Sequence, residues 1–251
     1  MGAEMHDFRP DHPGPIDGWP DAGFDAVLHL LDRQIVDSNG QLVGKVDDIE
    51  LVEDPDGRLV PTALLVGMAA LLPRFGAHAF RSWARLAPAF AERYQPGVVE
   101  IDLVDDVTSG VHLSVERDGL LRSRIDEVGH PVRHRLSTLL AMRVDLPPDA
   151  GAASHHARVL DVRLRSRAGA SGVQVGALLV GRGRPGSMLG YERSPERGPW
   201  LIASVVRWLH RHSRLVEVGD GVEVDWDAGV VRVAAGAAVR PVVDRSADGP
   251  A

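Results

Sequence analysis

The stretch that decides the fold is Lys45-Val46-Asp47-Asp48-Ile49-Glu50-Leu51, because it recurs in altered form as Arg158-Val159-Leu160-Asp161-Val162-Arg163-Leu164. A second stretch, Ala63-Leu64-Leu65-Val66-Gly67, recurs as Ala177-Leu178-Leu179-Val180-Gly181. The matched residues are 113 apart in the first case and 114 apart in the second, so only one residue has been inserted between them. Short apolar runs of this kind are typical of strands. Their repetition in the same order predicts two divergent copies of one small β-rich module in tandem.

Turn signals divide the first copy into three strands. Asn39-Gly40 follows the apolar run 30–36, and Asp54-Pro55-Asp56-Gly57 separates the run 42–52 from the run 59–66. Glycine accepts the positive φ of tight turns, while Asn, Asp and Pro favour the neighbouring turn positions. Three strands joined in this way form a meander, which begins a small sheet or barrel. The predicted structural turn residues are Asn39, Gly40, Gly44, Asp56 and Gly57.

Weaker matches extend the repeat in both directions. Val36-Asp37 aligns with Val144-Asp145, and the run 97–102 aligns with 221–225. A helical period from Phe80 to Phe90 has its counterpart in the apolar residues 201–209. In chain order we predict a flexible tail at 1–24, a first domain at 25–116, a helical connector at 117–142, a second domain at 143–240 and a second tail at 241–251.

The run from Ile35 to Ile49 resembles the opening hairpin of a PRC-barrel domain, with Gly40 at the hairpin turn and Gly44 at a strand bend. In the second copy Gly44 has no clear counterpart. The resemblance implies a mainly β fold: two small PRC-like β-barrels in tandem, each with a short helix, plus the helical connector. Similar domains occur in ribosome-maturation factors, in the H subunit of the photosynthetic reaction centre and in stand-alone proteins. The family supplies no common catalytic residue.

Composition excludes several kinds of site and sets the expected location. The chain has no cysteine, so disulfides, thiolate metal sites and cysteine nucleophiles are excluded. The longest apolar run, Ala63 to Leu72, is shorter than the roughly 18 residues that span a bilayer. The acidic, Pro- and Gly-rich N-terminus does not resemble a signal peptide, so we expect a cytoplasmic protein with no membrane span. Lys45 is the only lysine among 28 basic residues, which favours a bacterial genome of high GC content.

Motifs for catalysis, metals and nucleotides are weak. Gly181-Arg182-Gly183-Arg184-Pro185-Gly186 matches a dinucleotide fingerprint, but Pro185 and the loop residues after it do not begin the helix that such a site needs. A proline interrupts the helical spacing of His130 and His134. Asp54-Pro55-Asp56-Gly57 lacks the later Glu of a calcium loop. We therefore predict no catalytic residues, no metal ligands and no cofactor, and an enzyme of unknown chemistry is only the third alternative.

Charge is divided unevenly along the chain. Residues 1–116 carry 20 acidic and 8 basic residues, a net charge of −12, whereas residues 117–251 carry 15 and 20, a net charge of +5. Alternating arginines on the predicted strand 158–167 share one face. Such a face can bind phosphates or an acidic protein surface. The candidate partner-binding residues are Arg163, Arg165, Arg167, Arg182, Arg184, Arg207 and Arg211.

These features favour a non-catalytic adaptor or scaffold that binds a protein partner through its PRC-barrel modules. The main alternative is an RNA- or ribosome-associated factor that uses the arginine-rich face of the second domain. The acidic first domain is also a candidate partner for the basic second domain, within one chain or between chains.

Overall fold

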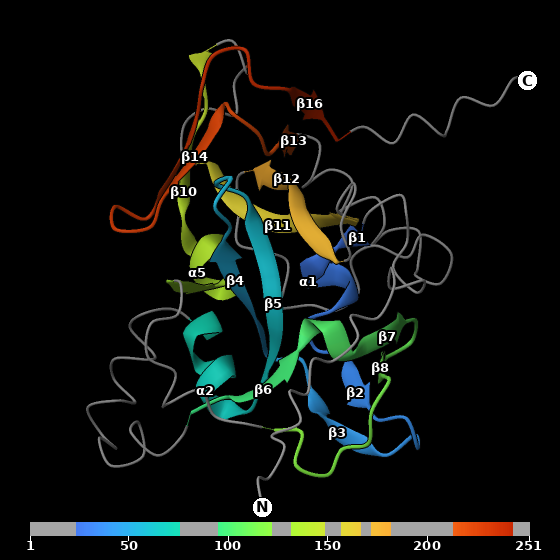
Figure 1. Cartoon of the computed structure of the whole chain (residues 1–251). Helices are drawn as coiled ribbons and strands as arrows, with labels where there is room; N and C mark the ends of the chain where they lie inside the picture. The colour runs from blue at the N-terminus through green and yellow to red at the C-terminus, as the bar shows by residue number, and fades with distance from the viewer. Residues whose placement is uncertain are drawn as a thin grey trace, which may run out of the picture.

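The computed structural model describes residues 24–75, 95–121, 132–148, 157–166, 172–181 and 213–242. These residues form three β-sheets and a few short helices, so the fold is mainly β, as the sequence predicts (Figure 1). The helices expected at 80–90 and 201–209 lie outside the described residues. Of the two expected tails, only Phe24, Pro241 and Val242 are described. No helix in the described part of the chain is long and apolar enough to cross a membrane.

We call residues 24–121 the N-terminal unit. Its described elements, with η for a 3₁₀-helix, are β1 (Phe24–Asp25), α1 (Ala26–His29), β2 (Gln34–Val36), β3 (Leu42–Lys45), β4 (Asp48–Glu53), β5 (Leu59–Val66), α2 (Met68–Leu71), η1 (Leu72–Phe75), β6 (Gly97–Glu100), η2 (Ile101–Leu103), β7 (Val104–Val107) and β8 (Val111–Leu113).

We call residues 132–242 the C-terminal unit. Its described elements are β9 (Arg133–Arg135), α5 (Leu136–Ala141), β10 (Arg143–Asp145), β11 (Ala157–Ser166), β12 (Val173–Gly181), β13 (Arg214–Glu217), β14 (Val222–Asp225), β15 (Val230–Val233) and β16 (Val239–Pro241).

Both units follow one strand order. In the C-terminal unit a single sheet runs β14-β15-β10-β11-β12-β13-β16. In the N-terminal unit the same order is split into the sheets β7-β8-β2-β3 and β4-β5-β6, with β9 outside β4. The parallel pair β2–β8 corresponds to the parallel pair β10–β15. The split arises because the chain between β3 and β4 breaks at Val46 and Asp47, whereas β11 runs unbroken over the corresponding length.

The hairpins β4–β5 and β11–β12 share one register. The facing residues are Asp48–Leu65, Ile49–Leu64 and Glu50–Ala63 in the first hairpin, and Asp161–Leu179, Val162–Leu178 and Arg163–Ala177 in the second. A bulge follows at the same place in each hairpin, with Thr62 as the extra residue of β5 and Gly176 as the extra residue of β12. The strand pairing therefore follows the 113- and 114-residue spacings of the sequence repeat.

The two units exchange their first elements. β1 pairs antiparallel with β11 of the C-terminal unit, and β9 pairs antiparallel with β4 of the N-terminal unit. α1 packs beside β11, and α5 contacts both β4 and β11 (Figure 1). Phe24, which the sequence assigned to a tail, is a buried residue of β1. Within the described part of the predicted helical connector, only Leu136–Ala141 form an α-helix, because Arg133–Arg135 are a strand of the sheet.

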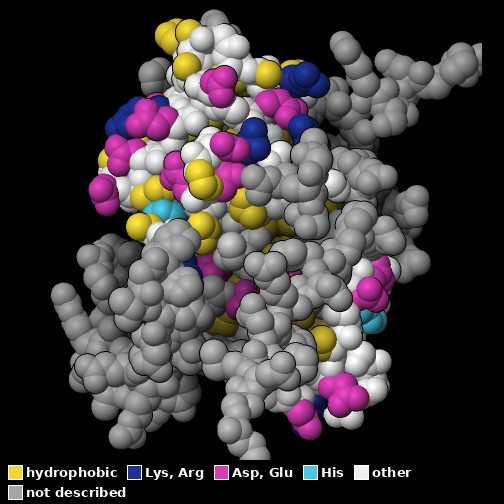
Figure 2. All heavy atoms as spheres, viewed as in Figure 1, with side chains coloured by type: hydrophobic (Ala, Val, Ile, Leu, Met, Phe, Trp, Pro, Cys, Tyr) yellow, Lys and Arg dark blue, Asp and Glu magenta, His cyan; other side chains and the backbone are white. Residues whose placement is uncertain are grey.

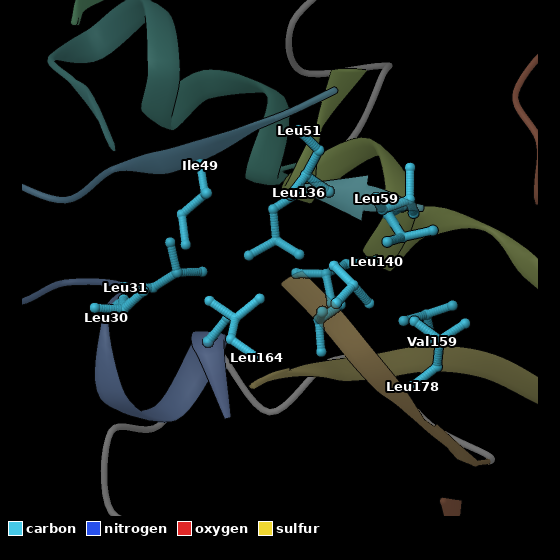
Figure 3. Close-up of a cluster of buried hydrophobic side chains, with 14 of the residues drawn as sticks. Leu30, Leu31, Ile49, Leu51, Leu59, Leu136, Leu140, Val159, Leu164 and Leu178 are labelled. Atoms are coloured by element: carbon cyan, nitrogen blue, oxygen red, sulfur yellow. The ribbon is translucent and has the colours of Figure 1, made fainter. Parts of the chain in front are cut away.

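One hydrophobic core serves both units. It includes Leu30 and Leu31 after α1, Ile49 and Leu51 of β4, Leu136 and Leu140 of α5, Leu164 of β11 and Leu178 of β12, each at most 5% exposed (Figure 3). Side chains of β4, β11 and β12 meet those of the helices α1 and α5 in this cluster. This cluster takes side chains from both units, whereas a smaller cluster of Ala63, Leu65, Ala70 and Val98 belongs to the N-terminal unit alone.

One sequence expectation is not confirmed and another is wrong. The described strands form open sheets, and none of these sheets closes into a barrel. The predicted match of 97–102 with 221–225 also fails: β6 occupies the place of β13, and β14 occupies the place of β7. Short runs that alternate valine with acids look alike, so composition alone does not distinguish these strands. Ile35 pairs with Gly44 as Val144 pairs with Ala157, so Ala157 takes the place of Gly44 in the second copy.

Candidate functional site

The two described arginines of the predicted arginine face both bind carboxylates of the same chain. Arg163 lies on β11 opposite Asp25 of β1, and its Nε and Nη2 donate to Asp25 Oδ1 at 2.9 Å and Oδ2 at 3.3 Å. This pairing raises the pKa of Arg163 despite its partial burial. The contact joins the predicted acidic first domain to the predicted basic second domain within one chain.

Arg165 forms a second bidentate pair, with Glu217 of β13. Its Nη1 and Nη2 donate to the two carboxylate oxygens at 2.7 and 3.0 Å. The side chain reaches β13 across the intervening strand β12 at Gly176, where a Cβ would lie only 2.5 Å from Arg165 Cδ. The bulge glycine therefore makes the room that this ion pair needs.

These pairs change what the arginine face can do. A phosphate would have to displace a carboxylate that already binds each guanidinium in bidentate geometry. Figure 2 shows acidic and basic side chains intermixed on the upper part of the visible surface, where Figure 1 draws the C-terminal unit. The remaining candidate residues, Arg167, Arg182, Arg184, Arg207 and Arg211, lie outside the described residues.

Two buried aspartates at equivalent positions bind the exchanged helices. Asp48 of β4 accepts the backbone N–H of Ser137 at 3.0 Å and the Ser137 hydroxyl at 2.5 Å. Asp161 of β11 accepts the backbone N–H of Val27 at 2.8 Å. Each carboxylate caps the first turn of a helix whose own N-cap residue makes no side-chain capping hydrogen bond. Burial raises the pKa of Asp48, although the hydrogen bonds from Ser137 and Ile49 act in the opposite direction.

A polar network in the N-terminal unit matches the arginine face in position. Glu50 of β4 corresponds to Arg163 in register, and its Oε1 lies 3.7 Å from Arg133 Nε of β9. Thr62, the bulge residue, donates its hydroxyl to the same oxygen at 2.8 Å. Arg135, directly opposite Glu50, donates to the carbonyl of Ala69 at 2.8 Å. The same site therefore holds a carboxylate in one unit and a guanidinium in the other.

The rings of His134 and Trp226 stack on each other between β9 and the β14–β15 turn. Their centroids are 3.6 Å apart and their planes differ by 7°. Burial lowers the pKa of His134, while Glu53 and Asp227 act to raise it. Trp226 Nε1 is buried without a hydrogen-bond partner among the described residues. Through this stack β9, which pairs with β4 of the N-terminal unit, also contacts the C-terminal unit.

The predicted turn residues lie in the turns that join β2 to β3 and β4 to β5: Asn39, Gly40, Asp56 and Gly57. Gly40 and Gly57 have φ of +74° and +75°, which glycine adopts without steric cost. Gly44 is different, because it lies within β3 and packs against β5. A Cβ there would come within 2.6 Å of Val66 Cγ1, so the glycine permits close strand packing.

Asp37, which the sequence analysis matched with Asp145 of the second copy, organises the first of these turns. Its Oδ1 accepts the backbone N–H groups of Asn39 at 2.9 Å and Gln41 at 2.7 Å, and its Oδ2 accepts that of Arg117 at 3.0 Å. Burial alone would raise the pKa of this carboxyl, but the three N–H groups lower it below the ordinary value.

The sequence analysis also did not predict that Asp25, Asp48 and Asp161 bind residues of other elements. A signal was present for two of them, since Asp48 and Asp161 fall at the same position of the repeat. No group of three His, Asp or Glu side chains able to hold a metal ion occurs within the part of the chain that the structure describes. No protein-family model matches the chain, and no curated protein is significantly similar to it.

Proposed function

We propose that the chain is a non-catalytic scaffold that binds another protein by adding an extended segment to a sheet. The observation that supports this proposal is strand addition within the chain. β1 belongs to the N-terminal unit but pairs with β11 of the C-terminal unit, and β9 belongs to the C-terminal unit but pairs with β4 of the N-terminal unit. Strand addition is a common mode of peptide recognition, with backbone hydrogen bonds for affinity and side chains for selectivity. The PRC-barrel resemblance, which we keep as part of this proposal, implies binding modules of the same class.

The charge arrangement also favours a protein partner over RNA. The N-terminal unit carries most of the excess acid, and Arg163 and Arg165 are matched by Asp25 and Glu217. Nucleic-acid binding depends on basic side chains that are free to contact phosphate. The net charge of +5 over residues 117–251 keeps an RNA-associated factor as the second candidate.

The test is affinity purification of the tagged full chain from its native host, with and without nuclease, followed by mass spectrometry. We expect a protein partner that survives nuclease treatment. That protein, purified separately, should bind the chain saturably and with fixed stoichiometry in isothermal titration calorimetry. Recovery of nuclease-sensitive RNA alone, or failure of every purified candidate to bind, would contradict the proposal.

Two sets of arginine variants separate the protein and RNA candidates. Replacement of Arg167, Arg182, Arg184, Arg207 and Arg211 by Ala should abolish binding of single-stranded RNA if the second candidate holds, and should leave the protein partner bound if the first one does. Arg163→Ala/Arg165→Ala is the matched control, because its expected effect is on stability and not on RNA affinity. Fluorescence anisotropy with labelled RNA at two salt concentrations measures the difference.

A further inference from the structure

The contacts that hold the exchanged segments have opposite polarity at equivalent positions. On β11 the sheet supplies a guanidinium, Arg163, and the added strand β1 supplies a carboxylate, Asp25. On β4 the sheet supplies a carboxylate, Glu50, which pairs with Arg133 of the added strand β9, while Arg135 faces Glu50 in register and donates to the carbonyl of Ala69. Asp25 faces Arg163 in the register in which Arg135 faces Glu50.

The carboxylates of these pairs are largely shielded from solvent, while the side chains of Arg133 and Arg163 are 21% and 32% exposed. The side chain of Glu50 is 9% exposed and that of Asp25 is 13% exposed. Charge pairs that are largely removed from water discriminate strongly, because a like charge placed there keeps its full desolvation cost and gains no attraction.

The helix caps discriminate little between the two segments, apart from the Ser137 hydroxyl that Asp48 accepts and that Val27 has no group to match. Asp48 and Asp161 both present a carboxylate to a helix N-terminus, and each accepts a backbone N–H that any residue except proline supplies. Both exchanged segments consist of a short strand followed at once by a short helix. Backbone pairing and capping would therefore let either segment add to either sheet.

We propose that the opposite polarity of the two ion pairs makes the exchange selective. Each sheet accepts the strand–helix segment of the opposite unit, from the same chain or from a second copy, and rejects the segment of its own kind. In the wrong pairing Asp25 would face Glu50 on one sheet, and Arg135 would face Arg163 on the other. This selectivity guides the chain to one pairing and is independent of what the scaffold binds.

The test exchanges the charges of the Asp25–Arg163 ion pair. The two side chains should still attract each other, but the two sheets should no longer select between the two segments. In Asp25→Arg/Arg163→Glu, β1 still meets an opposite charge on β11, but both sheets now present a carboxylate and both added strands present arginine. We expect the wild-type chain to refold from urea as a monomer. The double variant should give a severalfold larger fraction of exchanged dimers and higher oligomers, measured by size-exclusion chromatography with light scattering.

A matched control inverts a pair that lies within one unit. Arg165→Glu/Glu217→Arg changes as many charges on the same sheet but does not alter which segment fits which sheet. It should refold with the monomer yield of the wild type. Two differently tagged copies refolded together should co-purify only in the Asp25→Arg/Arg163→Glu background.

Inversion of both sites provides the decisive variant. Adding Glu50→Arg, Arg133→Glu and Arg135→Glu to the double variant restores opposite polarity, so monomeric refolding should return although five charges have changed. If the Asp25→Arg/Arg163→Glu chain fails to fold, the Glu50→Arg/Arg133→Glu/Arg135→Glu chain gives the same test from the other sheet. A double variant as monomeric as the wild type, or a fully inverted variant that does not recover, would overturn the proposal.

Discussion

The hairpins β4–β5 and β11–β12 have the same register and the same bulge, yet they share few side chains at the sites that bind the rest of the molecule. Glu50 stands where Arg163 stands, and Thr62 stands where Gly176 stands. Both aspartates that cap the exchanged helices are kept. Backbone hydrogen bonds and caps therefore define the common architecture, while charged and small side chains give each unit its own partner strand.

The capping aspartates should show the largest difference between the units. Asp48→Ala leaves the N–H groups of Ile49 and Ser137 and the Ser137 hydroxyl without their acceptor, which should cost about 3 kcal/mol. Asp161→Ala removes the acceptor of Val27 and Val162 and should cost about 2 kcal/mol. Urea unfolding followed by circular dichroism measures both values.

Asp48→Asn is the control for this comparison. Burial raises the pKa of Asp48, so the ionised carboxylate itself is disfavoured by the fold at neutral pH. An amide oxygen retains part of the cap without that charge, and the variant should lose less stability than Asp48→Ala. A larger loss for Asp161→Ala than for Asp48→Ala would contradict the assigned bonds.

The bulge residues should give the next largest effect. Gly176→Ala places a Cβ against Arg165 Cδ and displaces the pair with Glu217, at a cost of about 1–2 kcal/mol. In an Arg165→Ala background the same substitution should cost almost nothing, which a double-mutant cycle reveals. Thr62→Ala in the N-terminal unit should lose only its hydrogen bond to Glu50, about 1 kcal/mol. Equal costs for Gly176→Ala in both backgrounds would refute the steric explanation.

A smaller, pH-dependent effect on stability is expected near the break between β3 and β4, which has no counterpart in the unbroken β11. Arg74 donates to both carboxylate oxygens of Asp32 and to the carbonyl of Asp47, and this pairing lowers the pKa of Asp32. The stabilisation is therefore present above the ordinary value of 3.8 and is lost as the pH falls through the lowered pKa.

Asp32→Asn should lose less than about 1 kcal/mol at pH 7, because the Asp32 side chain is half exposed. The difference from the wild type should shrink as the pH falls toward 3, and urea midpoints at several pH values measure it. A difference that grows on acidification would contradict the assigned pair.

The second residue before each exchanged helix should give the smallest effect. Phe24 in β1 corresponds to His134 in β9, which stacks on Trp226. Because burial lowers the pKa of His134, the unfolded chain takes up a proton first, and stability should fall as the pH drops below about 6.5. His134→Phe should keep the stack and remove this slope between pH 7.5 and 5.5 in thermal melts. If the stability of His134→Phe depends on pH as steeply as that of the wild type, other titrating groups cause the dependence.

Sequence reasoning reached the mainly β fold and the hairpin repeat because strand periodicity and turn residues are local. It could not reach the exchanged strands, since Phe24–Asp25 and Arg133–Arg135 are too short to show a period, and their partners are distant in the chain. The helical period around Leu136 was visible, but the preceding strand was read as part of a connector.

The candidate site shows the same limit. The alternation of Arg163 and Arg165 predicted one polar face of a strand, which the structure contains. Pairing with Asp25 and Glu217 depends on which strands are neighbours, and residues 138 and 52 positions apart carry no local signal of this. Arginine counts alone therefore overstated the free positive charge of this face.

The exchange of first elements also bears on synthesis at the ribosome. β1 is translated early, but its partner residue on β11 follows 138 positions later. At ordinary rates of translation this interval is on the order of 10 s. Until then Phe24 and the apolar side of α1 have no sheet to cover them, and β4 likewise waits for β9. The sheet that contains β4 therefore lacks its last strand until β9 has been made, and β1 stays unpaired until β11 leaves the exit tunnel.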